Sequence, residues 1–85
     1  NMTEELNDLI QQVHAELKDF ANAWFASARQ LDENEFKRRV ESLDSKIELL
    51  IEVADDPDNS EFMTECSEEL ADISIYFDKL KASCK

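Results

Sequence analysis

Residues 6–24 read LNDLIQQVHAELKDFANAW. Apolar side chains recur in this stretch at steps that alternate between four and three residues, which places them along one side of an α-helix, as in coiled coils. Thr3 is a suitable N-cap for such a helix, and we expect the helix to cover about residues 3–31. Its apolar stripe consists of Leu6, Ile10, Val13, Leu17, Phe20, Trp24 and Leu31.

Two further segments show the same heptad spacing. The second covers about residues 33–54, and Asp32 with Glu35 matches the capping box that begins many helices. The third covers about residues 60–83. The predicted core positions are Phe36, Val40, Leu43, Ile47, Leu50 and Ala54 in the second segment, and Met63, Cys66, Leu70, Ile73, Phe77, Leu80 and Cys84 in the third.

The phase of the stripes indicates that the segments are separate helices. Continuing the first stripe beyond Leu31 puts the next core position at Asn34, yet the apolar residue is Phe36. On a straight helix Phe36 would lie about 140° around the axis from Leu31. The phase of the stripe shifts again between the second and third segments, where residues 55–59, DDPDN, form a typical turn sequence. The absence of glycine argues against a sheet. We therefore predict one all-α domain, residues 1–85, folded as an antiparallel up-down-up three-helix bundle with coiled-coil-like heptad packing.

The charge narrows the choice of partner. The 85 residues contain 21 Asp and Glu against 9 Lys and Arg, a formal net charge of −12. This charge disfavours DNA, RNA and anionic membranes as direct ligands and favours a protein with a basic surface. No apolar run approaches the ~18 residues of a membrane span, and the N-terminal residues lack a basic signal-peptide region. Two cysteines make no disulfide framework, so we expect a cytoplasmic protein with reduced thiols.

No group of residues indicates catalysis. His14 is the only histidine, whereas nucleophilic triads and most zinc sites pair histidine with Cys, Ser or carboxylates, so we interpret it as a surface residue. Cys66 and Cys84 fall on the core stripe, roughly 27 Å apart by helix rise, and are expected to act as small apolar groups. The run 56–61 lacks the Gly and the later Glu of a calcium loop. We predict no enzyme activity, no metal site and no cofactor.

The binding surface is predicted on the third segment. Between Ile47 and Asp78 there are eleven acidic residues and no basic one, which indicates either a solvated face or a docking face. Ile75 falls nearly opposite the core stripe, whereas Phe25 and Leu49 fall on the flanks of theirs. An apolar anchor surrounded by charge is typical of protein interfaces. The predicted partner-binding residues are Glu65, Glu68, Asp72, Ile75, Tyr76 and Phe25.

Two functions fit these features. The first is a small acidic protein-binding module, acting as an adaptor, chaperone or inhibitor, with a homodimer left open. The alternative is an acidic nucleic-acid mimic that inhibits a DNA- or RNA-binding protein. The mimic is expected to lose binding when its carboxylates are neutralised, whereas the adaptor is expected to lose more when Ile75 or Phe25 becomes Asp.

Overall fold

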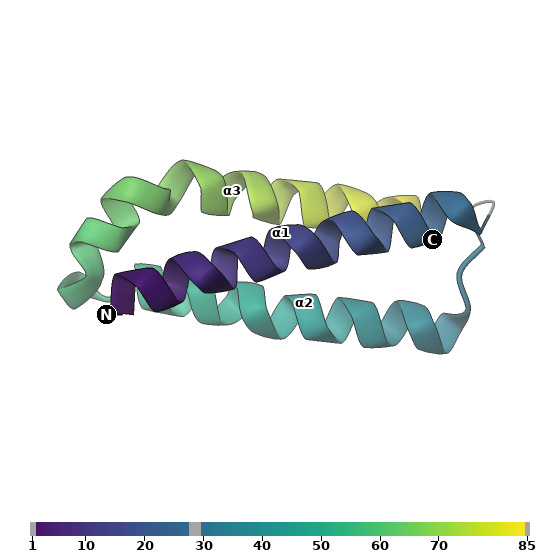
Figure 1. Ribbon diagram of the computed structural model, residues 1–85, viewed down its shortest axis with the longest axis horizontal. Helices are drawn as coiled ribbons and strands as arrows, with labels where there is room; N and C mark the ends of the chain where they lie inside the picture. The colour runs from purple at the N-terminus through teal and green to yellow at the C-terminus, as the bar shows by residue number, and fades with distance from the viewer. Residues whose placement is uncertain (1, 28–29, 85) are drawn as a thin grey trace.

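The computed structural model describes residues 2–27 and 30–84, with side chains from residue 4 onward. Within this part of the chain the helices are α1 (Met2–Ala26), α2 (Glu33–Ala54) and α3 (Ser60–Ser83). α2 runs antiparallel to α1 and α3, and α1 begins at the end of the bundle where α2 turns into α3 (Figure 1). The bundle extends 43 × 19 × 16 Å along its principal axes. The predicted all-α, up-down-up three-helix bundle is therefore confirmed.

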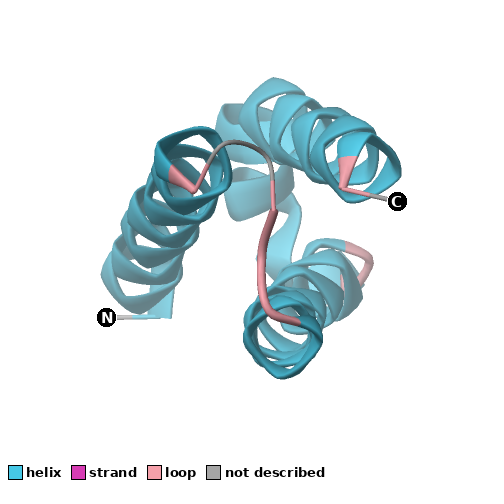
Figure 2. Ribbon diagram, turned by 90° about the vertical axis from the view of Figure 1, so that its right-hand side faces the viewer, coloured by secondary structure: helices cyan, strands magenta, loops and turns pink. Residues whose placement is uncertain are grey.

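The three apolar stripes meet in a single core between the helices, which are seen from one end in Figure 2. Fully burying a side chain of the size of Leu, Ile or Phe stabilises the fold by roughly 1.5–3 kcal/mol, so these contacts hold the helices together. None of the helices, as far as the described residues go, has the length and apolarity needed to cross a membrane. The buried residues are Leu6, Ile10, Val13, Leu17, Phe20, Ala21, Leu43, Ile47, Leu50, Ala54, Phe62, Cys66, Leu70, Ile73, Phe77 and Leu80.

The core is less closed at the end where α1 and α3 finish and α2 begins. Five predicted core residues of that end are only partly buried there, although they pack against the core. The aromatic rings of Phe20 and Phe36 meet edge to face, with their centroids 5.9 Å apart. The five partly buried residues are Trp24, Leu31, Phe36, Val40 and Cys84.

α1 ends earlier than its heptad pattern predicts. The expected end near residue 31 is wrong, because the helix stops at Ala26; residues 28–29 of the predicted helix lie outside the described residues. The Ser27 hydroxyl donates to the carbonyl oxygen of Trp24 at 3.1 Å, a local bond that competes with the helical ladder. The Gln30 backbone N–H then donates to the Ser27 carbonyl oxygen at 3.2 Å and closes a turn. Leu31 thus reaches the core from a loop.

The N-terminal ends of α1 and α2 were both predicted from capping residues, and they differ in how they are formed. α1 begins at Met2, one residue before the predicted N-cap Thr3, whose side chain lies outside the described part. The Asp32 carboxylate caps α2 by accepting the backbone N–H groups of Asn34 and Glu35 at 3.1 and 3.2 Å. The second half of the predicted capping box is absent, because the Glu35 carboxylate instead accepts two hydrogen bonds from Arg39.

The turn between α2 and α3 forms where the sequence places it. α2 ends at Ala54, and a short 3₁₀ turn, η1 (Pro57–Asn59), leads directly into α3. The Asp56 carboxylate accepts the Asp58 backbone N–H at 2.9 Å and so begins this turn. Pro57 occupies its first position, where the missing proline N–H costs nothing.

The first core residue of α3 is Phe62, and the predicted residue, Met63, is wrong. Phe62 is 2% exposed, whereas Met63 is 40% exposed. Counted from Cys66, Phe62 is displaced about 40° around the helix and Met63 about 60° in the opposite direction. Phe62 therefore lies nearer the centre of the buried stripe, and its aromatic ring fills this end of the core.

Candidate functional site

An apolar groove lies between α1 and α3, and half of the predicted binding residues line it. Two adjoining cavities of about 620 and 500 Å³ share Phe25 and Tyr76, and we call them together the α1/α3 groove. From α1 it is lined by His14, Leu17, Lys18, Ala21, Asn22, Trp24 and Phe25, and from α3 by Asp72, Ile73, Tyr76, Lys79, Leu80 and Ser83.

The floor and the rim of the groove differ in exposure. Leu17, Ala21 and Ile73 are buried core residues whose side chains form the floor. Phe25 and Tyr76 stand on opposite walls and are 61% and 48% exposed. Large aromatic side chains in such positions keep apolar surface in water, where a partner could cover it.

The structure separates the six predicted binding residues into two sets. Phe25, Asp72 and Tyr76 line the α1/α3 groove. Glu65, Glu68 and Ile75 are exposed on α3 and line neither cavity of the groove. Ile75, at 54% exposure, points to solvent as predicted.

A hydrogen bond links α1 and α3 at one end of the groove. His14 Nε2 on α1 lies 2.8 Å from Glu69 Oε1 on α3, and both side chains are about half exposed. His14 is therefore a surface residue, as predicted, and it ties α1 to α3. The strength of the contact depends on the charge of the imidazole, since only the protonated ring forms a true ion pair.

The charges are divided along the bundle. Residues 1–17 and 47–70 hold thirteen carboxylates and no Lys or Arg, and we call this part the acidic half. Residues 18–46 and 71–85, the balanced half, hold eight carboxylates and all nine Lys and Arg residues. Because α2 runs antiparallel to its neighbours, the two acidic stretches come together at the end of the bundle that carries the N-terminus (Figure 1).

The α1/α3 groove opens mainly on the balanced half. Lys18 on one wall and Lys79 on the other face it together with Asp72. Within the described residues none of these three side chains forms an ion pair. Their charges are thus available to a partner. The sequence could have indicated Lys18, since it shares one flank of α1 with His14 and Phe25 at steps of four and seven residues.

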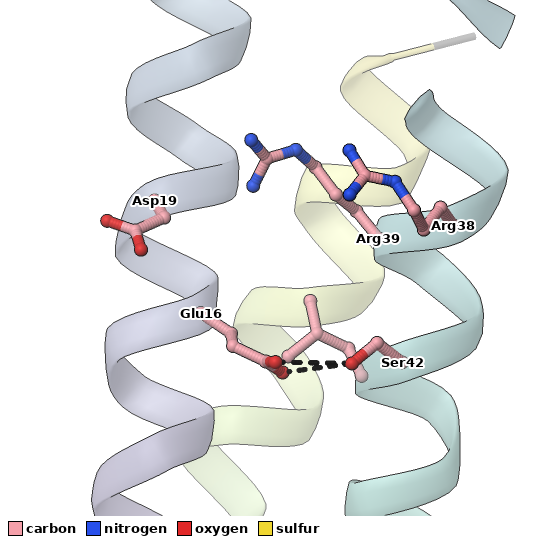
Figure 3. A pocket seen from close by; sticks show the side chains of 6 residues that line it. Glu16, Asp19, Arg38, Arg39 and Ser42 are labelled. Carbon is pink, nitrogen blue, oxygen red and sulfur yellow. Dashed lines mark hydrogen bonds between the residues drawn. The ribbon is translucent and has the colours of Figure 1, made fainter. Parts of the chain in front are cut away.

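A second pocket, of about 270 Å³ between α1 and α2, is polar and structural (Figure 3). Glu16 projects into it from α1 and accepts hydrogen bonds from Ser42 at 3.2 Å and from Lys46 at 2.5 Å. Arg38 and Arg39 project from α2, and Arg39 pairs with Glu35 of its own helix. Glu16 thus ties α1 to α2 through Ser42 and Lys46, and the apolar residue that lines this pocket, Leu43, is buried in the core.

The cysteines lack the features of reactive thiols. Cys66 is buried, and its Sγ donates to Asn7 Oδ1 at 3.3 Å. Burial raises the pKa of the Cys66 thiol, and the nearby Glu69 and Glu65 carboxylates raise it further. Burial also raises the pKa of Cys84. Both thiols stay protonated at neutral pH, and Cys66 packs in the core as predicted.

The acidic turn residues act as caps. The Asp56 carboxylate holds the Asp58 N–H, and the Asn59 side-chain amide donates to the Val53 carbonyl at 3.3 Å. No group of three or more His, Cys, Asp and Glu side chains among the described residues is placed to hold a metal ion.

Comparisons of this chain with models of known protein families, with curated proteins and with solved structures found no match.

Proposed function

We propose that this chain is a small acidic protein-binding module, of the adaptor, chaperone or inhibitor kind, which acts through helix surfaces and not as a catalyst. The α1/α3 groove supports this proposal, because two exposed aromatic side chains, Phe25 and Tyr76, flank a floor of buried aliphatic residues. Aromatic anchors beside an apolar depression dominate the binding energy of many protein interfaces.

The shape of the groove suits a polypeptide. Its walls run from His14 to Phe25 on α1 and from Asp72 to Ser83 on α3. Each wall is about 16 Å long by helix rise, or about three helical turns. A helix laid along two others buries its apolar stripe in the manner of a four-helix bundle. The groove thus fits the apolar face of a helix from a protein chain.

The acidic half adds a second, charged contact. Glu65 and Glu68 are exposed on α3, and the acidic half offers no Lys or Arg to neutralise them. Electrostatic complementarity speeds association and selects partners. We propose that a protein held by this module presents a basic surface to the acidic half.

The acidic half also supports a second candidate, a nucleic-acid mimic that occupies the binding surface of a DNA- or RNA-binding protein. Thirteen carboxylates in stretches that contain no Lys or Arg imitate the charge of a phosphate backbone. Such binding depends on the carboxylates and on salt concentration, and it makes no use of the groove.

Site-specific photo-crosslinking tests the proposal. A benzoylphenylalanine at Asn22, on the groove wall, is expected to cross-link a protein in cells of the source organism. The same residue at Leu49, which is exposed on α2 and outside the groove, is the matched control and is expected to give no product. Tyr76→Glu is expected to abolish the Asn22 product. Equal cross-linking from both positions, or none from Asn22, contradicts the proposal.

A double charge variant, compared with the groove variant Tyr76→Glu, distinguishes the protein-binding module from the nucleic-acid mimic. Glu65→Gln combined with Glu68→Gln is expected to weaken the captured complex several-fold at low salt and little at high salt, because the groove still holds the partner. For the mimic the same variant abolishes the complex, while Tyr76→Glu leaves it intact.

A further inference from the structure

We infer that the α1/α3 groove is filled by a second copy of this chain, so that two bundles pack side by side and antiparallel. This assignment rests on the proposed function, which makes the groove a protein-binding surface. It names the chain that fills the groove and leaves the acidic half of each copy to the basic partner. Three features of the structure support it: the apolar surface left in water, the separation of charge along the bundle, and the mixed charges around the groove.

The end of the bundle where the core is least closed carries exposed aromatic side chains. Phe25 and Tyr76 are exposed there, and Trp24 beside them is only partly buried. A chain of this length buries a thin core, and small domains commonly gain stability by association. A second copy supplies an equal apolar surface, so that each groove receives aromatic side chains from the other.

The charge separation selects the antiparallel arrangement. Two copies side by side in parallel bring two sets of thirteen carboxylates together. Charges separated by more than a Debye length of about 8 Å are largely screened. An antiparallel pair joined through the balanced halves moves the two acidic halves to opposite ends of an assembly longer than one 43 Å bundle. Only the antiparallel pair therefore avoids strong repulsion.

The groove itself carries charges of both signs. Lys18 and Lys79 face it together with Asp72, and none of the three forms an ion pair within the described residues. In a two-fold symmetric contact the same surface meets itself, so it must be complementary to itself. Lysine and aspartate on one surface satisfy this requirement, whereas a uniformly basic partner is repelled by both lysines.

Sedimentation velocity over a wide concentration range tests the inference. The protein is expected to move from its monomer mass of 9.8 kDa to twice that value as the concentration rises. Phe25→Glu and Tyr76→Glu are each expected to weaken the dimer at least tenfold. Leu49→Glu is the matched control, because it places the same charge on a comparably exposed apolar position on α2, outside the groove, and it is expected to leave the dimer unchanged. Circular dichroism confirms that each variant is folded.

The orientation of the two copies has its own measurement. Glu5, at the acidic end of each copy, is replaced by a ketone-bearing residue that carries a spin label, and the distance between the two labels is measured by electron spin resonance. In the antiparallel dimer their separation is expected to exceed the 43 Å length of one bundle. A much shorter separation means a parallel pair and overturns the arrangement.

The outcomes also separate this inference from the proposed function. A protein that stays monomeric at every concentration, while Asn22 still cross-links a different protein, overturns the second copy and keeps the module. A dimer that survives both groove variants overturns the inference as well. If Tyr76→Glu changes neither the mass nor the cross-link, the groove binds no protein and both fail.

Discussion

Replacing Phe62 by Ala tests the register of α3 most directly. Phe62 is 2% exposed, so nearly the whole ring is removed from water on folding. Truncating a buried Phe to Ala costs about 3–5 kcal/mol, because the transfer energy is lost and a cavity remains. A domain of this size has a total stability of roughly 4–13 kcal/mol. The substitution is thus expected to remove a large part of the free energy of unfolding.

The matched variant is Met63→Ala, one residue along the same helix. Met63 is 40% exposed, and its truncation is expected to cost less than about 1.5 kcal/mol, since little of the side chain leaves a packed environment. Both values come from urea titrations followed by circular dichroism, and the corresponding thermal midpoints should differ by about 10 °C or more. If the two variants lose equal stability, or Met63→Ala loses more, the heptad position at Met63 is correct and the register described above is wrong.

Three further perturbations probe other contacts. Glu16→Gln, which weakens the bond to Lys46 between α1 and α2, is expected to cost about 0.5–1 kcal/mol in urea titrations at low salt and less at high salt, because both side chains are partly exposed. Asp32→Ala, which removes the N-cap of α2, is expected to cost about 0.5–2 kcal/mol, and an unchanged thermal midpoint contradicts the capping role. The pKa of Cys66 is raised above 9.0 in the folded state, so the stability gained from a neutral thiol is present below pH 9 and is lost as the pH rises through the folded pKa. Cys66→Ala should therefore flatten the decline of unfolding free energy above pH 9, and a decline as steep as that of the unmodified chain contradicts the assignment.

Local signals predicted two of the helices accurately. α2 and α3 have the predicted bounds, because Asp32 and the Asp55–Asn59 turn mark helix ends through bonds within a few residues. α1 was predicted too long, since a heptad pattern continues through Leu31 whether or not the backbone stays helical. The helix ends at Ala26, next to the bond from Ser27 to Trp24, while Leu31 still reaches the core from the loop.

The candidate site was predicted only in part, for a physical reason. Exposure of Phe25, Leu49 and Ile75 follows from helical periodicity alone and is confirmed. The grouping of Phe25 with Tyr76 depends on how closely α1 approaches α3, which periodicity does not encode. The acidic run 47–78 was recognised, but its union with the acidic N-terminal stretch requires the antiparallel path of α2.

The division of charge along the bundle gives the molecule a large electric dipole. In the field of a positively charged surface the bundle experiences a torque that turns its acidic half toward that surface before contact. Adsorption to an anion-exchange resin is then end-on, and retention follows the local charge of the acidic half more than the net charge of −12. Neutralising two carboxylates in the acidic half should accordingly advance elution more than neutralising two in the balanced half.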